Sequence, residues 1–100
     1  LPGYDRLMSA APALRPLVKA ASWIGDRRWN LLFATGETLV LPEDGAQAAL
    51  VKFASIDSSR QLLGRGLLRF DMRDPTRMVV RRPGPGAIRA ITDLASGSEG

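Results

Sequence analysis

At 100 residues, with 45% apolar and 24% charged side chains, the chain is long enough for one domain built around a small hydrophobic core. It contains no histidine and no cysteine, which excludes imidazole bases, thiol nucleophiles, disulfides and zinc sites built on these residues. Its net charge of +4, carried mostly by arginine, favours anionic partners. The arginine excess reflects either a role in bidentate recognition or simply an arginine-favouring genome.

No apolar run approaches the ~18 residues of a membrane span, and residues 1–5 lack the charged and apolar regions of a signal peptide. The chain is therefore expected to be soluble. It begins without a methionine, as a fragment of a longer protein would, so any anchor or targeting segment is expected upstream.

The first segment has helical periodicity, because apolar residues recur at three- and four-residue steps between Tyr4 and Val18. Pro12 and Pro16 interrupt this pattern, since each removes an amide donor and disfavours the α conformation in the residue before it. The pattern therefore predicts a kinked helix or two short helices rather than one straight helix.

Three strands are predicted next, at residues 20–24, 27–34 and 38–41. Gly25 and Asp26 give a turn between the first two strands, and a Thr-Gly-Glu turn separates the last two. In the second strand Trp29, Leu31 and Phe33 alternate with other residues and form one apolar face. An antiparallel meander of three strands is the expected arrangement.

A helix and a second hairpin follow the meander. Asp44 is a good N-cap for a helix whose apolar residues keep helical spacing to about Asp57, and this helix is expected to cover the sheet. Two further strands, at residues 67–73 and 77–82, alternate in polarity and are joined by a turn at Asp74-Pro75-Thr76.

The predicted fold is α+β: residues 1–83 form an antiparallel sheet of mixed order, with about five strands and one or two covering helices. Residues 84–100 are rich in glycine and serine and are expected to be a disordered tail, despite the weak apolar spacing of Ile88, Ile91 and Leu94. The chain is thus predicted to be one domain followed by a tail.

Candidates for catalysis are weak throughout the chain. Asp57, Asp71 and Asp74 lack a histidine or a metal-like cluster, and each has an ordinary place at a helix end, on a solvated strand or in a turn. The paired glycines at 64 and 66 and at 84 and 86 do not form a phosphate-binding loop, because no helix of the right spacing follows them. No catalytic residue, metal site or cofactor is predicted.

Trp29 lies beside Arg27 and Arg28, an arrangement that could stack and neutralise single-stranded nucleic acid. The chain has only six aromatic residues, however. Trp29 is also in phase with the apolar side of its strand, so burial in the core is the favoured interpretation.

The last hairpin carries the most information about function. A three-residue turn would place Arg69 opposite Arg81, Phe70 opposite Val80 and Asp71 opposite Val79, and likewise Met72 opposite Met78 and Arg73 opposite Arg77. One face, with Leu68, Phe70, Met72, Met78 and Val80, is predicted to be core. On the other face, arginines of one strand lie directly opposite arginines of the other, and an acidic partner would relieve the repulsion between them. Alternatively, the arginines extend into water and discourage edge-to-edge aggregation.

Between about Tyr4 and Pro83 the chain contains, in this order, Arg27-Arg28-Trp29-Asn30-Leu31, Thr35-Gly36-Glu37, Leu41-Pro42-Glu43, the predicted helix, and Phe70-Asp71-Met72-Arg73-Asp74-Pro75. The order and spacing of these motifs resemble the C-terminal half of the bacterial FtsQ/DivIB cell-division family, in its alphaproteobacterial style. Each motif is degenerate alone, and together they are fairly specific. The resemblance implies a non-enzymatic β domain on the periplasmic face of the inner membrane, and this fragment of it is expected to lack the first strand.

By the same resemblance, the parent protein would be anchored by one membrane span and would scaffold the divisome during septum formation. It would bind FtsB-like and FtsL-like partners, with a partner strand adding to the last strand of the sheet, a mode known as β-augmentation. The positions that correspond here are Arg27, Arg28, Arg73, Arg77, Met78, Val79, Val80, Arg81 and Arg82. Since no later strand is predicted, residues 77–82 are expected to form an open edge.

The alternative function is a basic nucleic-acid-binding module that uses the arginine-rich face. It predicts an affinity that falls steeply with salt and depends little on base sequence. No small-molecule substrate is expected under either hypothesis.

Overall fold

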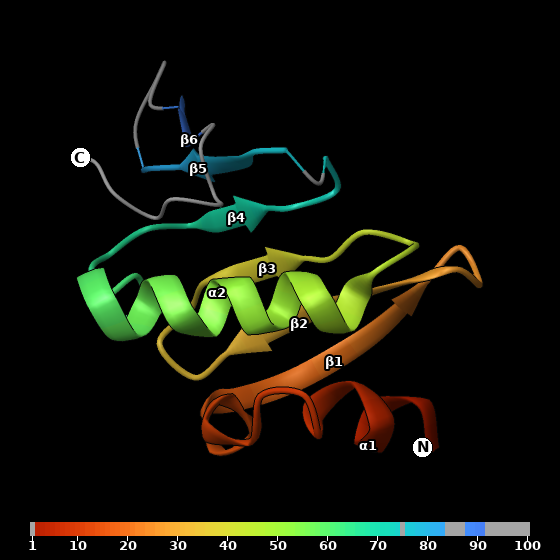
Figure 1. The fold of residues 1–100 in the computed structure, drawn as a ribbon. Coiled ribbons are helices and arrows are strands. Elements are labelled where there is room, and N and C mark those ends of the chain that lie inside the picture. Colours follow the sequence, from red (N-terminus) through yellow and green to blue (C-terminus); the bar gives the residue numbers. More distant parts are fainter. Residues whose placement is uncertain (1, 75, 84–87, 92–100) are drawn as a thin grey trace.

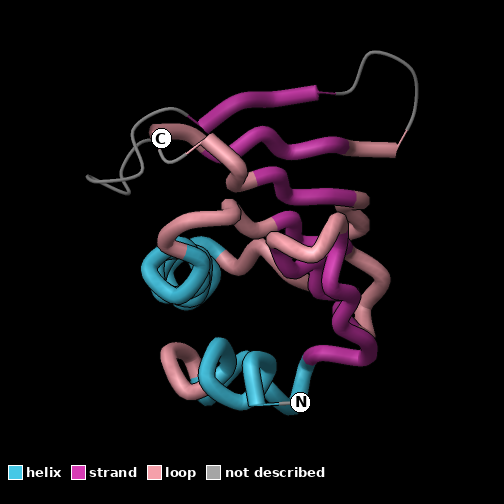
Figure 2. Tube along the Cα trace, turned by 90° about the vertical axis from the view of Figure 1, so that its right-hand side faces the viewer, coloured by secondary structure: helices cyan, strands magenta, loops and turns pink. Residues whose placement is uncertain are grey.

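The computed structural model describes residues 2–74, 76–83 and 88–91. One sheet of six strands runs in the order β1-β2-β3-β4-β5-β6. Figures 1 and 2 show that helices α1 and α2 lie on the same side of this sheet and leave its other face free of helices. The fold is therefore α+β, as the sequence predicts, with one main helix. The strands are β1 (Val18–Ile24), β2 (Arg28–Phe33), β3 (Thr38–Val40), β4 (Arg69–Asp71), β5 (Met78–Arg81) and β6 (Ile88–Ile91).

The N-terminal segment forms two short helices, which confirms the break predicted from its prolines. Helix α1 spans Pro2–Met8, and a 3-10 helix, η1, spans Pro12–Leu17. Pro12 occupies the first turn of η1, where its missing amide costs nothing, and Pro16 lies inside η1. Arg15 connects the two helices, because it donates to Asp5 at 2.6 Å.

Strands β1, β2 and β3 form the predicted antiparallel meander. Gly25 and Asp26, at the β1–β2 turn, both have left-handed backbone conformations, with φ of 59° and 61°. Two consecutive positive φ values are typical of the tight turns whose twist matches a hairpin. In β1–β2 the turn brings Trp23 opposite Trp29.

Helix α2 (Ala46–Arg60) carries the chain across the sheet, so that β4 pairs with β3 in the parallel direction. The sequence analysis expected an antiparallel sheet; the β3–β4 pair is parallel because a helix between two strands returns the chain to the same end. The N-cap is Gly45, with φ of 74° and no side-chain cap, rather than the predicted Asp44. At the other end Asp57 accepts the amides of Leu62 and Leu63, at 2.7 and 3.0 Å.

The β4–β5 hairpin has the predicted register for its three ladder pairs: Arg69 with Arg81, Phe70 with Val80 and Asp71 with Val79. Four of the five residues assigned to its core face are buried. The exception is Leu68, which is 45% exposed and lies just before β4, so its assignment to the core is wrong.

Strand β6 differs from the expectation of a disordered tail and of an open β5. Ile88–Ile91 pair antiparallel with the whole of β5, from Met78 opposite Ile91 to Arg81 opposite Ile88. This pairing supplies backbone partners that a terminal β5 would lack on that side. The rest of the predicted tail, residues 84–87 and 92–100, lies outside the described residues.

The core lies between the sheet and the helices. Phe53 of α2 is fully buried between two sheet residues, with ring centroids 5.8 Å from Phe33 and 5.1 Å from Phe70. Trp29 is 9% exposed and belongs to the same cluster, which confirms its predicted burial. Within the described residues, no helix has both the length and the apolarity to cross a membrane.

Candidate partner-binding surface

Strand β5 divides its side chains between the two faces of the sheet. Met78 and Val80 point into the core and are 0% and 5% exposed, whereas Val79 is partly exposed on the helix-free face and Arg81 is exposed. Of the candidate residues on this strand, Met78 and Val80 can therefore offer a partner only their backbone. Arg82 follows the strand and is also exposed.

Across the helix-free face, Val79 lies in a row with Asp71, Val40 and Asn30, which face one another through successive strand pairs. Val40 is fully buried there, although no helix covers it. The neighbouring row contains Arg69 directly opposite Arg81, so the like-charge pair predicted from the sequence is present. Both side chains are exposed, and such a pair is mildly destabilising until a counter-charge approaches.

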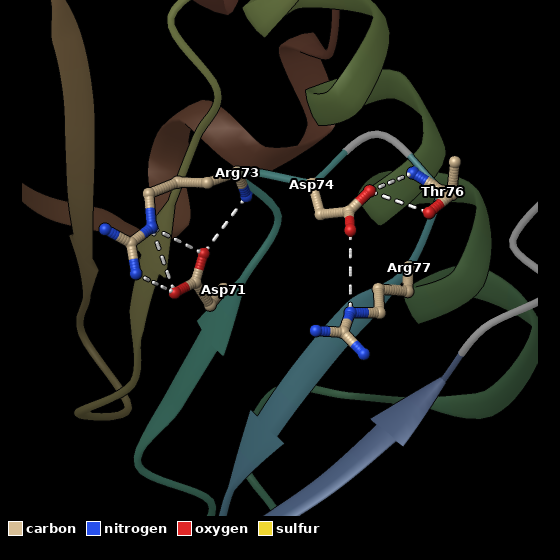
Figure 3. Close-up of polar contacts among 5 residues, drawn as sticks. All are labelled: Asp71, Arg73, Asp74, Thr76 and Arg77. Carbon is tan, nitrogen blue, oxygen red and sulfur yellow. Dashed lines mark hydrogen bonds and ion pairs between the residues drawn. The ribbon is translucent and has the colours of Figure 1, made fainter.

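Arg73 is held by Asp71 (Figure 3). The Arg73 Nε donates to both carboxylate oxygens, at 3.0 and 3.1 Å, the terminal nitrogen donates at 2.7 Å, and the Arg73 backbone amide donates at 3.0 Å. Burial alone would raise the pKa of Asp71, but the hydrogen bonds and charge of Arg73 outweigh it and hold this pKa below its ordinary value. Asp71 thus fixes the position of the guanidinium group.

Arg77 has a different anchor. Its Nε lies 3.6 Å from Asp74 in the turn between β4 and β5. Asp74 also accepts the backbone amide and the hydroxyl of Thr76, at 2.9 and 2.7 Å, and these hydrogen bonds lower its pKa. Arg73 and Arg77 lie outside the strand ladder and each contacts its own carboxylate, so the predicted repulsion between them is relieved within the turn (Figure 3).

Arg27 and Arg28 lie at a separate place, at the start of β2, with β3 and β4 between them and β5. Arg27 approaches Glu43 at 3.9 Å, and both side chains are more than half exposed, which makes this a weak ion pair. The Nε of Arg28 and the Oδ1 of Asn30 are buried and have no hydrogen-bond partner in the described structure. The structure does not bring these two arginines together with those of the last hairpin.

Two further residues, Trp23 and Glu37, had no clear signal in the sequence. Trp23 on β1 is 48% exposed and lies beside a groove with Arg27 and Arg28. Its signal in the sequence was only an aromatic residue in a segment without clear alternation. Glu37 in the β2–β3 turn is fully buried, although a charged residue in a turn normally predicts exposure.

The described residues contain no group of three acidic side chains placed to hold a metal ion. What the β4–β5 region offers is a row of arginines, some held by carboxylates and some exposed, beside the side of β5 that pairs with β6. Such an arrangement can pair backbone with an extended chain and can attract carboxylates.

Comparison with known proteins identifies the family. The model of "Cell division protein FtsQ/DivIB, C-terminal" matches residues 4–73, which run from α1 to two residues past the end of β4. No solved structure matches the chain.

The relatives agree with this match. The chain is 48% identical over 100 residues to the cell division protein FtsQ of Zymomonas mobilis, covering 99% of this chain and 32% of that protein. It is 52% identical over 81 residues to the FtsQ of Novosphingobium aromaticivorans, covering 79% of this chain and 25% of that protein. The chain therefore spans about a third or less of these relatives, and it belongs to the FtsQ/DivIB family of cell-division proteins, within the C-terminal domain.

Proposed function

We propose that this domain is a non-enzymatic scaffold of the divisome on the periplasmic face of the inner membrane. It binds FtsB-like and FtsL-like proteins, and a partner strand pairs with the outer edge of β5. Family membership supports the setting in cell division. The edge of β5 supports the binding mode, because strand addition needs a run of backbone amides and carbonyls more than any particular side chain.

The observation that carries this proposal is the pairing of β6 with β5. All four residues of β5, Met78–Arg81, take antiparallel partners in β6, so the backbone of this edge is competent to receive an added strand. A partner strand would use the same backbone groups and would have to replace β6 there. Partner binding and β6 pairing are therefore mutually exclusive under this proposal.

The arginines would give the edge its preference among strands. Arg69 and Arg81 oppose each other without an intervening carboxylate in the ladder, and an acidic residue from the partner would lower their repulsion. Arg73 is pre-positioned by Asp71, which reduces the entropy lost when it contacts a partner. Arg82, and Arg27 or Arg28 at the far side, would add longer-range attraction for an acidic chain.

The alternative of nucleic-acid binding gains little support from the structure. Trp29 is buried and cannot stack on a base, and both Arg73 and Arg77 already contact carboxylates that would repel phosphate. The other arginines of this face could bind either carboxylates or phosphates.

A reversible lock between β5 and β6 tests the proposal. The chain has no cysteine, so Val79→Cys with Ala90→Cys would form one disulfide between positions that face each other across the pair. We expect the oxidised protein to lose binding to the periplasmic part of the FtsB-like partner in calorimetry, and a reductant to restore it. A protein carrying only Val79→Cys is the matched control and should bind in both conditions.

Equal binding by the locked and the reduced protein would contradict strand addition at β5. In that case, two explanations remain, partner binding by the arginine face alone and binding of nucleic acid, and a charge reversal separates them. Arg81→Glu should then abolish partner binding if the arginine face acts alone, and binding of an oligonucleotide with a steep salt dependence would favour the nucleic-acid alternative.

A further inference from the structure

The end of the molecule at which α2 finishes is built from segments that flank the strands on one side. They are the end of η1, the β2–β3 turn, the loop from α2 to β4, and the end of β5, and Figure 1 shows them on the left of the view. Hydrogen bonds join neighbouring segments: the Ala34 amide donates to the Leu17 carbonyl at 2.8 Å, and the Gly64 amide donates to Glu37 at 2.7 Å. We call residues 17, 34–37, 61–69, 81 and 82 the loop end of the domain.

Two leucines are exposed at the loop end. Leu17 is 41% exposed and Leu68 is 45% exposed, and they are two of the four large apolar side chains that are exposed in the described part of the chain. The backbone holds Leu68 in place, because its amide donates to the Arg81 carbonyl at 2.9 Å and its carbonyl accepts the Thr38 amide at 3.0 Å. Leu68 therefore cannot turn into the core without losing two hydrogen bonds of the sheet.

The loop end carries a positive charge. Its exposed charged side chains are those of Arg65, Arg69, Arg81 and Arg82. Glu37 is the one acidic residue of the loop end, and it is fully buried. Five other acidic residues lie at or just after the opposite ends of β1, β3 and β4: Asp26, Glu43, Asp44, Asp71 and Asp74. The loop end therefore attracts anions.

A hollow of about 330 Å³ lies between Leu17 and the loop from α2 to β4. Its apolar walls are Leu17, Ala34 and Leu63. The one acidic residue of its lining, Asp57, accepts the amides of Leu62 and Leu63 at 2.7 and 3.0 Å, and these donors offset its charge. This part of the loop end thus offers apolar walls and no uncompensated negative charge.

We propose that the loop end binds the surface of an anionic phospholipid bilayer. Leu17 and Leu68 enter the boundary between headgroups and acyl chains, while Arg65 and Arg69 bind headgroup phosphates. Such binding grows with the apolar area buried in the boundary and with the attraction between basic side chains and anionic lipids. A nucleic acid would use only the arginines and would leave both leucines in water. The combination of exposed leucines with arginines is what favours a membrane over other anions.

This site differs from the surface proposed for strand addition. Leu17, Arg65 and Leu68 take no part in that proposal, whereas Arg69 and Arg81 lie at the border between the two sites. The test below therefore changes only residues that the membrane proposal uses alone. Failure of the β5 lock to block partner binding would leave its outcomes unchanged.

Sedimentation with lipid vesicles tests the proposal on the 100-residue chain, at about 150 mM salt, where long-range attraction is screened. The chain should bind vesicles of phosphatidylglycerol and phosphatidylcholine in equal parts at least about tenfold more tightly than vesicles of phosphatidylcholine alone. Leu68→Ser should weaken binding to the anionic vesicles by at least about threefold, and Arg65→Glu by at least about tenfold.

Two residues of α2 outside the loop end provide matched controls. Val51 is 47% exposed, so Val51→Ser removes a comparable apolar surface, and Lys52→Glu reverses an exposed charge. Each control should change vesicle binding by less than about twofold. All four side chains are exposed, so these variants should keep the fold, which circular dichroism checks.

A tryptophan reporter locates the contact with the lipid. The fluorescence added by Leu68→Trp should be quenched by bromine-labelled lipids in the anionic vesicles, whereas the fluorescence added by Val51→Trp should not. Equal quenching at the two positions would overturn the proposal, and so would equal binding to the two kinds of vesicle. The proposal is also wrong if Arg65→Glu weakens binding no more than Lys52→Glu does. An effect of Arg65→Glu without any effect of Leu68→Ser would point instead to a soluble anionic partner.

Discussion

The carboxylate of Glu37 accepts the backbone amide of Gly64 at 2.7 Å and so joins the β2–β3 turn to the loop that follows α2. Glu37 is fully buried, and its second oxygen accepts the hydroxyl of Thr35. A buried carboxylate is tolerated when its oxygens are hydrogen-bonded in this way. This contact fixes the loop that leads the chain from α2 into β4.

Replacing Glu37 with alanine should therefore destabilise the domain by about 1–3 kcal/mol, since the Gly64 amide would lose its charged acceptor and the Thr35 hydroxyl its partner. For a domain of this size, such a loss lowers the melting temperature by roughly 4–8 °C per kcal/mol. Thermal unfolding followed by circular dichroism measures the change. Glu37→Gln keeps one acceptor oxygen and should recover part of it.

Glu43→Ala is the matched control, because it removes an exposed carboxylate near the other end of β3 and should change stability by no more than about 0.5 kcal/mol. If Glu37→Ala were no more destabilising than Glu43→Ala, the contact to Gly64 would not be what holds the loop.

The Asp71–Arg73 pair predicts a dependence of stability on pH. Because the folded-state pKa of Asp71 is lowered, its contribution is present above the unfolded value of about 3.9 and is lost as pH falls through the folded value. Asp71→Asn should cost on the order of 1 kcal/mol at pH 7, since Arg73 is half exposed and solvent weakens the pair. Urea unfolding at several pH values measures the difference.

The difference between the wild type and Asp71→Asn should shrink as pH falls from about 4 through the lowered pKa of folded Asp71, because below that pKa the wild type is uncharged at this position as well. Arg73→Gln removes the other partner and should reproduce the same pH profile, and the double variant should cost little more than either single one. A constant difference from pH 7 to pH 3 would show that packing of Asp71, rather than its charge, is responsible.

Phe70 and Leu68 test the assignment of faces in β4. Phe70 is fully buried against Phe53, so Phe70→Ala should cost about 3–5 kcal/mol, a large part of what a small domain has. Leu68→Ala should cost well under about 1 kcal/mol, since this side chain is nearly half exposed. Denaturant unfolding compares the two, and similar losses would mean that Leu68 is buried in solution.

The sequence predicted the structure well wherever the burial or conformation of a residue follows from its neighbours in the chain. The alternation of Trp29, Leu31 and Phe33 predicted one apolar face, and these residues are buried. The prolines predicted the break between α1 and η1, and the Asp-Pro-Thr turn predicted the register of β4 with β5. Each of these features depends on residues that are close together in the chain.

What the sequence did not reveal depends on contacts between distant segments. No local pattern states that β4 pairs with β3, because a crossover brings them together only after α2 has packed. The partner of Glu37, at position 64, is likewise distant in sequence. Glycine and proline after Arg82 suggested a tail, whereas Ile88–Ile91 pair with an edge that the sequence left open.

Removal of β6 should change both the stability of the domain and its affinity for the partner. A chain cut after Pro83 loses four backbone pairs along β5, so its melting temperature should fall by several degrees relative to a chain cut after Ile91. Its affinity for the FtsB-like partner should rise, because a site that is open all of the time binds more tightly than one that its own strand occupies for part of the time. Circular dichroism and calorimetry on the two truncated chains provide both measurements.

Lower affinity after the cut at Pro83 would mean that the partner contacts β6 itself or needs it to order β5. An unchanged melting temperature would mean that β6 contributes nothing to the sheet in solution.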